Sequence, residues 1–193
     1  MKKHIDLGCG SSPRNPFGAE KVYGLDIVKR NNLIEDNVFF EKSNLILESI
    51  PYENNTFDSV SAYDFFEHIP RVVVNNDETF FPFINLMNEI YRVLKDGGEL
   101  YAITPIFPKE SAFVDPTHVN FISKNTYKYF CEPDLWAKMY GYTGKFEIIR
   151  VQIVNFDYEV NQKIGLKKTI RSFLNFVYPK RKQHIVWHLK AIK

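Results

Sequence analysis

Residues 2–27 read KKHIDLGCGSSPRNPFGAEKVYGLDI, and this stretch decides the fold. A short apolar run, Ile5 to Leu7, leads directly into a Gly-Cys-Gly turn, and a second run ends on the acid Asp26. Glycines at the carboxyl end of a strand let the backbone approach a ligand, because no Cβ stands in the way. An aspartate that ends the next strand can accept hydrogen bonds from both hydroxyls of a ribose. The stretch therefore predicts a nucleoside site at the strand ends of a parallel sheet.

Along the rest of the chain, short β-type runs alternate with helical ones, which is typical of an α/β protein. We expect seven strands, at His4–Leu7, Val22–Leu25, Val38–Phe40, Phe57–Ala62, Glu99–Thr104, Phe146–Val154 and His184–Ile192. One helix is indicated by apolar residues at helical spacing, namely Phe80, Phe83, Ile84, Met87, Ile90, Tyr91 and Leu94. Thr79 or Asp77 can cap its start, and Gly97-Gly98 is expected to end it. The pattern predicts a single doubly wound, mostly parallel sheet.

The composition fits one globular domain, because the chain has 193 residues and is 45% hydrophobic. Cys9 and Cys131 show no disulfide or metal-ligand spacing, and no apolar run reaches the roughly 20 residues that span a bilayer. We therefore expect a cytoplasmic protein. Residues 160–193 carry nine Lys or Arg and no acid, whereas the remainder carries 16 basic and 23 acidic side chains. This asymmetry indicates either an anionic partner or an ordinary solvated surface.

The kind of nucleoside is narrowed by the glycine pattern. A dinucleotide fingerprint is G-x-G-x-x-G followed by a helix whose N-terminus holds the pyrophosphate. Here Gly8 and Gly10 are present, but Pro13 takes the third place. Only 11 residues separate Gly10 from Val22, and two of them are prolines, so a full helix barely fits. This counts against NAD and FAD, and it leaves a nucleoside without phosphate.

Four blocks of the sequence together resemble the class I (Rossmann-like) S-adenosylmethionine-dependent methyltransferases. The blocks are HIDLGCG, VYGLDI, IPYENNTFDSVSAYDFFEHIP and INLMNEIYRVLKDGGELYAITP, and they lie in that family's order over roughly the first 110 residues. The resemblance implies S-adenosylmethionine as the cofactor. It also implies that the last of the seven strands runs antiparallel to the others.

The resemblance further implies where the cofactor binds. Asp6, Gly8 and Gly10 match positions that line its methionine and ribose, and Asp26 matches the residue that holds the ribose hydroxyls. Asn44 stands where the family usually has an acid that takes the adenine amino group. The full set that the resemblance implies is Asp6, Gly8, Cys9, Gly10, Asp26, Ile27, Asn44, Leu45, Tyr63, Asp64 and His68. Cys9 is interpreted as packing rather than as a nucleophile, and His68 as a helix-start residue that bonds to backbone.

A general base is needed only if the methyl acceptor is a hydroxyl or a protonated nitrogen. The segment FVDPTHVNFISKNTYKYF, residues 113–130, offers Asp115 and His118 in a proline turn. Asp115 can orient His118 as a base, or the two can bond only to hold the loop. Similar D-P-x-H segments occur in relatives encoded near carbohydrate-assembly enzymes, and by this analogy we expect a glycan or glycolipid acceptor, with a small molecule as the open alternative.

The chain divides by this interpretation into a cofactor core (1–110), a lid or acceptor segment (111–145) and the last two strands (146–193). The last part contains a basic helical insertion at 163–182, which fits either peripheral contact with an anionic membrane or packing on the sheet. No metal site is predicted, because two histidines of the final strand, His184 and His188, lie roughly 13 Å apart. Nucleic acid is an unlikely partner for an acidic body.

Two function classes stay open at this point. The first is an active methyltransferase with an unidentified acceptor. The alternative is a catalytically weak, methyltransferase-like binding or scaffold module, and an NAD-dependent oxidoreductase is a more remote reading. Whether the protein binds S-adenosylmethionine distinguishes the active methyltransferase from the scaffold module.

Overall fold

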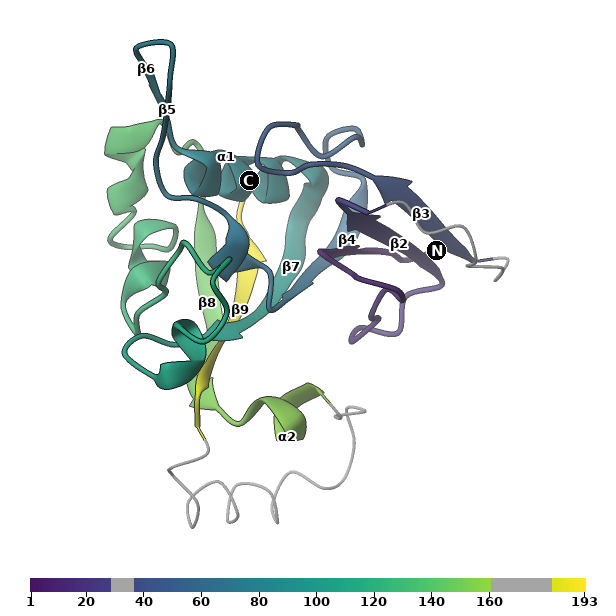
Figure 1. Cartoon of the computed structure of the whole chain (residues 1–193). Coiled ribbons are helices and arrows are strands. Elements are labelled where there is room, and N and C mark those ends of the chain that lie inside the picture. Colours follow the sequence, from purple (N-terminus) through teal and green to yellow (C-terminus); the bar gives the residue numbers. More distant parts are fainter. Residues whose placement is uncertain (29–36, 161–181) are drawn as a thin grey trace.

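The computed structural model describes residues 1–28, 37–160 and 182–193. They form a seven-stranded sheet in the order β3-β2-β1-β4-β7-β9-β8, with a small two-stranded sheet beside it (Figure 1). The seven strands are β1 (Lys3–Leu7), β2 (Lys21–Asp26), β3 (Val38–Lys42), β4 (Phe57–Tyr63), β7 (Leu94–Pro105), β8 (Phe146–Val154) and β9 (His184–Ala191). All seven expected strands are confirmed.

The direction of the strands is also as expected. The pairs β1–β2, β2–β3, β1–β4 and β4–β7 are parallel, and β9 lies antiparallel between β7 and β8. The strand order runs outward in both directions from β1 and β4, so the sheet reverses between these two strands. Ligands of open α/β sheets bind outside the carboxyl ends of strands at such a reversal.

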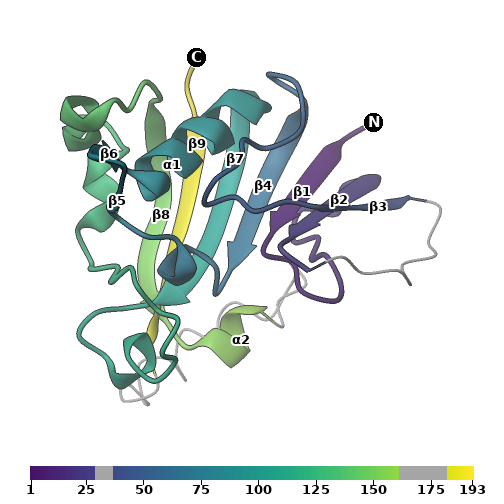
Figure 2. The ribbon, with the colours of Figure 1, turned by 45° about the horizontal axis from the view of Figure 1, so that its top comes forward.

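Helix α1 (Pro82–Val93) covers one face of the sheet (Figure 2). The buried face of the helix packs against every second residue of the strands beneath it. This face includes Phe83, Leu86, Met87, Ile90 and Val93. The expected ends of this helix are wrong. It begins at Pro82 without a side-chain cap, and Leu94 is already extended (ψ 143°) because it pairs with Phe57 of β4. Gly97 and Gly98 therefore lie within β7 rather than at the end of the helix.

A hairpin before α1 was not expected. Strands β5 (Val73–Asn75) and β6 (Glu78–Phe80) pair antiparallel, and two residues connect them. These are Asn76 and Asp77, both with positive φ (48° and 65°), which Asn and Asp tolerate better than other side chains. The turn uses Asp77, which is why this residue does not cap the helix.

The opposite face of the sheet is covered differently. Residues 11–20, between β1 and β2, form turns instead of a helix, as the two prolines predict. From this segment Phe17 packs its ring near His4, Tyr101 and His188 of three strands. The short helix α2 (Phe156–Val160) follows β8. The predicted basic helix at 163–182 lies outside the described residues except for its last position. Among the helices that the structure describes, none is long and apolar enough to span a membrane.

Candidate active site

The Gly-Cys-Gly turn and Asp26 meet at the carboxyl ends of β1 and β2. Gly8 and Gly10 have positive φ (64° and 61°), a conformation that glycine adopts without strain. The amide of Gly10 donates to Asp26 Oδ2 (2.8 Å), and the amide of Val28 donates to Oδ1 (3.0 Å). Each carboxylate oxygen thus keeps a further lone pair. Asp26 is turned toward the glycine turn, as a ribose clamp requires.

The two glycines of the turn differ in how much space surrounds them. A Cβ added to Gly8 would lie 2.4 Å from Cδ2 of Phe65, so the Phe65 ring packs directly on this glycine. A Cβ at Gly10 would meet no heavy atom within 4 Å, which leaves room for a ligand there. Cys9 is buried between the glycines, and its burial raises the pKa of the thiol to about 12. A protonated, buried thiol agrees with the packing role.

Four other predicted cofactor residues differ in their surroundings. Asp6 is fully buried and accepts hydrogen bonds from the Arg14 amide (2.8 Å) and the Ser61 hydroxyl (2.5 Å), and burial raises its pKa to about 6. Asn44 follows β3 and its side-chain oxygen accepts from the Ile46 amide (3.2 Å). Asn44 is therefore partly engaged in its own turn. The remaining two are Leu45, which is buried, and Ile27, which is exposed.

Tyr63 is the last residue of β4, and Asp64 follows it and lines a neighbouring cavity. Tyr63 is buried, with the Arg14 guanidinium 4.6 Å from its ring centroid, and burial raises the pKa of its hydroxyl. Asp64 has a positive φ of 47°, and its Oδ1 lies 3.2 Å from Nε2 of His184. These two residues point to different places, Tyr63 into the sheet face and Asp64 into the cavity.

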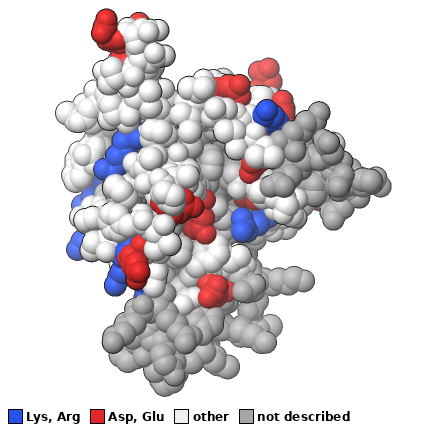
Figure 3. Space-filling view, in the orientation of Figure 1, with Lys and Arg blue, Asp and Glu red and all other residues white. Residues whose placement is uncertain are grey.

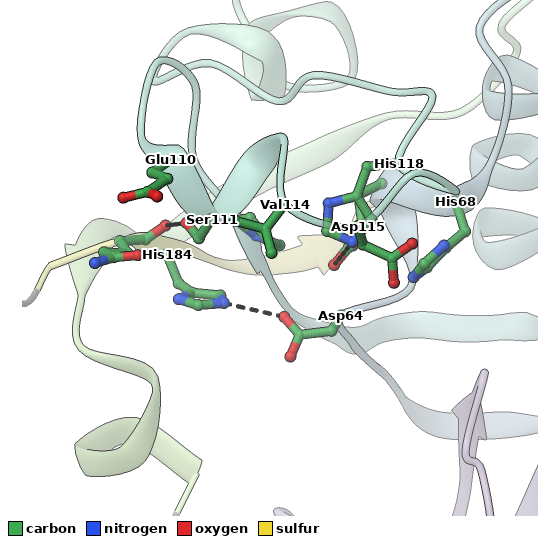
Figure 4. Close-up of a pocket in the computed structure, with 11 residues that line it drawn as sticks. Asp64, His68, Glu110, Ser111, Val114, Asp115, His118 and His184 are labelled. Carbon is green, nitrogen blue, oxygen red and sulfur yellow. Dashed lines mark hydrogen bonds and ion pairs between the residues drawn. The ribbon is translucent and has the colours of Figure 1, made fainter.

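The cavity has a volume of about 520 Å³ and lies beyond the ends of β4 and β7, between the loop that follows β7 and the start of β9 (Figure 4). Acidic side chains gather around these strand ends near the centre of the face in Figure 3. Most of the residues that line it carry polar or titratable side chains, and the lining consists of Asp64, Glu67, His68, Pro105, Glu110, Ser111, Val114, Asp115, His118, Gln183 and His184. Such a lining suits a polar, hydroxyl-bearing molecule.

Glu67 is the most buried carboxylate of this lining, with 1% of its surface exposed. It belongs to the short helix η1 (Phe66–His68). Its Oε2 accepts from the Thr104 hydroxyl (2.8 Å), whereas its Oε1 lies 3.9 Å from Nε2 of His118. Burial raises the pKa of Glu67 to about 8. The carboxylate that faces His118 is therefore Glu67.

The side chains of Asp115 and His118 do not pair, and the structure agrees better with the alternative that they hold the loop, because the His118 amide donates to the Asp115 carbonyl (3.1 Å). Asp115 accepts from the amide (2.8 Å) and the hydroxyl (2.7 Å) of Thr117, two residues further on, as Asp often does in turns. The ring of His118 instead places Nδ1 3.3 Å from the carbonyl of Ala112. The catalytic role of Asp115 and His118 stays a prediction.

His68 also differs from its interpretation. Its Nδ1 lies 2.9 Å from the Thr117 hydroxyl rather than from a backbone group. Burial and the neighbouring His118 lower its pKa, and the two imidazole centroids are 4.9 Å apart.

Glu67 and His184 were not predicted to belong to the candidate site. Glu67 directly precedes His68 in the block IPYENNTFDSVSAYDFFEHIP, and this position is the signal that could have identified it. His184 lies far along the chain and reaches the cavity only because β9 inserts beside β7. In this pairing His184 lies opposite Pro105. His188, four residues further along β9, has its Nε2 2.5 Å from Oε2 of a different carboxylate, that of Glu99. The two histidines therefore do not share one ligand.

Comparison with known proteins gives one family and many similar folds. A family model described as a methyltransferase domain matches residues 5–102. No curated protein matches the sequence. Among solved structures, an S-adenosylmethionine dependent methyltransferase from Mesorhizobium loti is similar, with 15% identity and a TM-score of 0.55 over 97% of this chain and 90% of that one.

Two further structures show how widely this fold is used. A geranyl diphosphate C-methyltransferase from Streptomyces coelicolor, solved with Mg²⁺, geranyl diphosphate and S-adenosyl-L-homocysteine, has 15% identity and a TM-score of 0.56 over 100% of this chain and 73% of that one. The cyclase SpnF has 16% identity and a TM-score of 0.55 over 99% and 74%. At these identities the likeness concerns the fold alone.

Proposed function

Because the chain belongs to the methyltransferase domain family, whose model matches residues 5–102, we propose that it transfers the methyl group of S-adenosylmethionine to an acceptor bound in the cavity beyond β4. The observation that carries this proposal is the arrangement at the strand ends. Asp26 offers two free lone pairs beside the open space at Gly10, and the cavity begins on the other side of Asp64.

The residues present fit S-adenosylmethionine. Asp26 can hold the two ribose hydroxyls with the lone pairs that Gly10 and Val28 leave free. Gly10 leaves open space in which the cofactor can approach the backbone, and Asn44 offers an amide near the expected position of the adenine. When bound, the cofactor supplies a methyl group already activated by its sulfonium, so the protein contributes orientation and exclusion of water.

The acceptor is proposed to be a hydroxyl-bearing glycan, glycolipid or small molecule. This proposal is supported by the lining of the cavity, where Ser111, Gln183 and several carboxylates and imidazoles offer hydrogen bonds. His118 faces the cavity with Nε2, and it can accept the proton that the acceptor hydroxyl loses. Asp115 fixes the loop through Thr117 instead of acting on His118 directly. Contact of the basic segment 163–182 with a membrane remains a prediction.

The test combines binding and turnover. Calorimetry with S-adenosylmethionine and S-adenosylhomocysteine is expected to show binding of both, and a methyl-labelled cofactor is expected to label one pool among sugars, lipid-linked sugars and small molecules. A protein that binds neither nucleoside contradicts the proposal and favours a scaffold. A protein that binds both but labels no pool contradicts the proposed acceptor class.

A further inference from the structure

Glu67, His68 and His118 come together on the wall of the cavity. One potential ligand atom of each lies within 4.8 Å of the other two. We propose that these three side chains form a binding site for a divalent transition-metal ion, of the class that takes imidazole and carboxylate ligands, such as Zn²⁺. The proposal concerns binding and does not depend on methyl transfer.

The first argument is the state of the Glu67 carboxylate. Within the described residues its Oε1 is buried and has no hydrogen bond, although only 1% of the residue is exposed. A buried polar atom without a partner destabilises the folded protein, and it does so more strongly when the group is charged. The other oxygen is held by Thr104, so the unpartnered oxygen is fixed in the direction of His118.

The second argument is the tautomer of His118. Its Nδ1 lies 3.3 Å from the Ala112 carbonyl, which can only accept, so Nδ1 carries the hydrogen in the neutral ring. Nε2 then presents a lone pair to Oε1 of Glu67 at 3.9 Å. Two tetrahedral ligand atoms that are each about 2 Å from one ion lie about 3.3 Å apart, so the two atoms need to approach by only about 0.6 Å to hold a cation between them.

The third argument is the environment of His68. The hydroxyl of Thr117 donates to Asp115, so it faces Nδ1 of His68 as an acceptor. This leaves the hydrogen on Nδ1 and a lone pair on Nε2. Histidines that bind metals generally donate their second ring nitrogen to an oxygen in this way. The hydrogen bonds that link Asp115 to Thr117 and Thr117 to His68 thus orient the His68 ring for metal binding, a role that the sequence did not indicate.

Three protein ligands leave at least one coordination position for a molecule in the cavity. Asp64, Glu110 and Asp115 also line the cavity, so its surroundings are acidic enough to favour a cation. A hydroxyl bound to a divalent cation has a lowered pKa. With the ion bound, His118 would serve as a ligand rather than as the base, and a coordinated acceptor hydroxyl would pass its proton to one of the other carboxylates of the lining.

The test measures metal binding by the whole protein. Metal-free protein is titrated with Zn²⁺ by calorimetry and with Co²⁺ by visible absorption. We expect one equivalent of Zn²⁺ and a Co²⁺ spectrum of low coordination number. Glu67→Gln keeps an oxygen for Thr104 and should fold, and we expect at least about 100-fold weaker Zn²⁺ binding, because changes to outer partners alone cost 10–100-fold.

Two further variants sharpen the result. Thr117→Val removes the partner of His68 and is expected to weaken binding about 10–100-fold. His188→Gln removes an imidazole that faces a carboxylate outside the cavity, so it is expected to bind Zn²⁺ as the unaltered protein does. Absence of stoichiometric binding overturns the proposal, and so does a Glu67→Gln protein that binds Zn²⁺ unchanged. Thermal melting of each metal-free variant shows that it is folded.

Discussion

Replacement of Asp26 by alanine tests the cofactor site directly. In the structure each carboxylate oxygen accepts one backbone amide, from Gly10 or Val28, and keeps one lone pair for a ribose hydroxyl. Each lost hydrogen bond to the cofactor contributes about 0.5–1.5 kcal/mol net, so the pair contributes about 1–3 kcal/mol. This corresponds to a Kd for S-adenosylhomocysteine that is roughly 5- to 150-fold higher.

The assay is calorimetric titration of the variant with S-adenosylhomocysteine, because the product analogue binds without turnover. Asp26→Asn keeps an oxygen for one backbone amide and loses the charge, so we expect it to fall between alanine and the native residue. Asp77→Ala, in the exposed β5–β6 turn, is the matched control and should bind normally. An Asp26→Ala protein that is folded and binds with unchanged affinity refutes the assignment of the ribose site.

Three other perturbations have defined outcomes. His118→Ala is expected to spare cofactor binding and to reduce methyl transfer, and an equal loss of both would make the residue structural. Burial lowers the pKa of His4 to about 4 and raises that of Asp6 to about 6, so their effects on stability oppose each other. Glu67, whose pKa burial raises to about 8, acts equally in both variants, so their two pH profiles are compared with each other. Asp6→Asn keeps the His4 effect, which removes stability as pH falls from about 6.5 to 4, and His4→Gln keeps the Asp6 effect, which removes stability as pH rises from about 4 to 6. In urea unfolding, the stability of Asp6→Asn should therefore fall relative to that of His4→Gln as pH falls from about 6 to 4, with each group contributing at most about 1.4 kcal/mol per pH unit, and parallel profiles would contradict this. Gly8→Ala places a side chain at φ 64°, which costs about 1–2 kcal/mol, and drives it into Phe65, so Phe65→Ala should restore part of the stability measured by urea unfolding.

The strands were predictable because their signal is local. Each apolar run of β type is short and bounded by turn residues, and the predicted range of β8 coincides with the observed Phe146–Val154. The ends of α1 were not predictable in this way. Leu94 belongs to the apolar stripe of the helix, yet its pairing with Phe57 of β4 makes it extended. A tertiary hydrogen-bond ladder outweighed the local helical pattern there.

The candidate cofactor site could largely be predicted from the sequence, because its residues lie close to one another along the chain. Gly8, Gly10 and Asp26 sit at the ends of two consecutive parallel strands, and parallel strands present their carboxyl ends at one edge of the sheet. The acidic cavity could not be predicted from the sequence in this way. Asp115 and His118 are neighbours in sequence, and local spacing favoured a pair that the loop does not form.

The sequence by itself determined the seven strands, the glycine turn and the acid opposite it, because strand periodicity and turn chemistry act over a few residues. The tertiary structure alone decided which carboxylate faces His118 and that His184 reaches the same cavity. Glu67 and His118 are far apart in the chain, and they meet only when η1 and the loop after β7 pack together, with the Glu67 carbonyl accepting the amides of Val119 and Asn120. Contacts of this kind depend on packing between distant segments, which no local pattern of residues encodes.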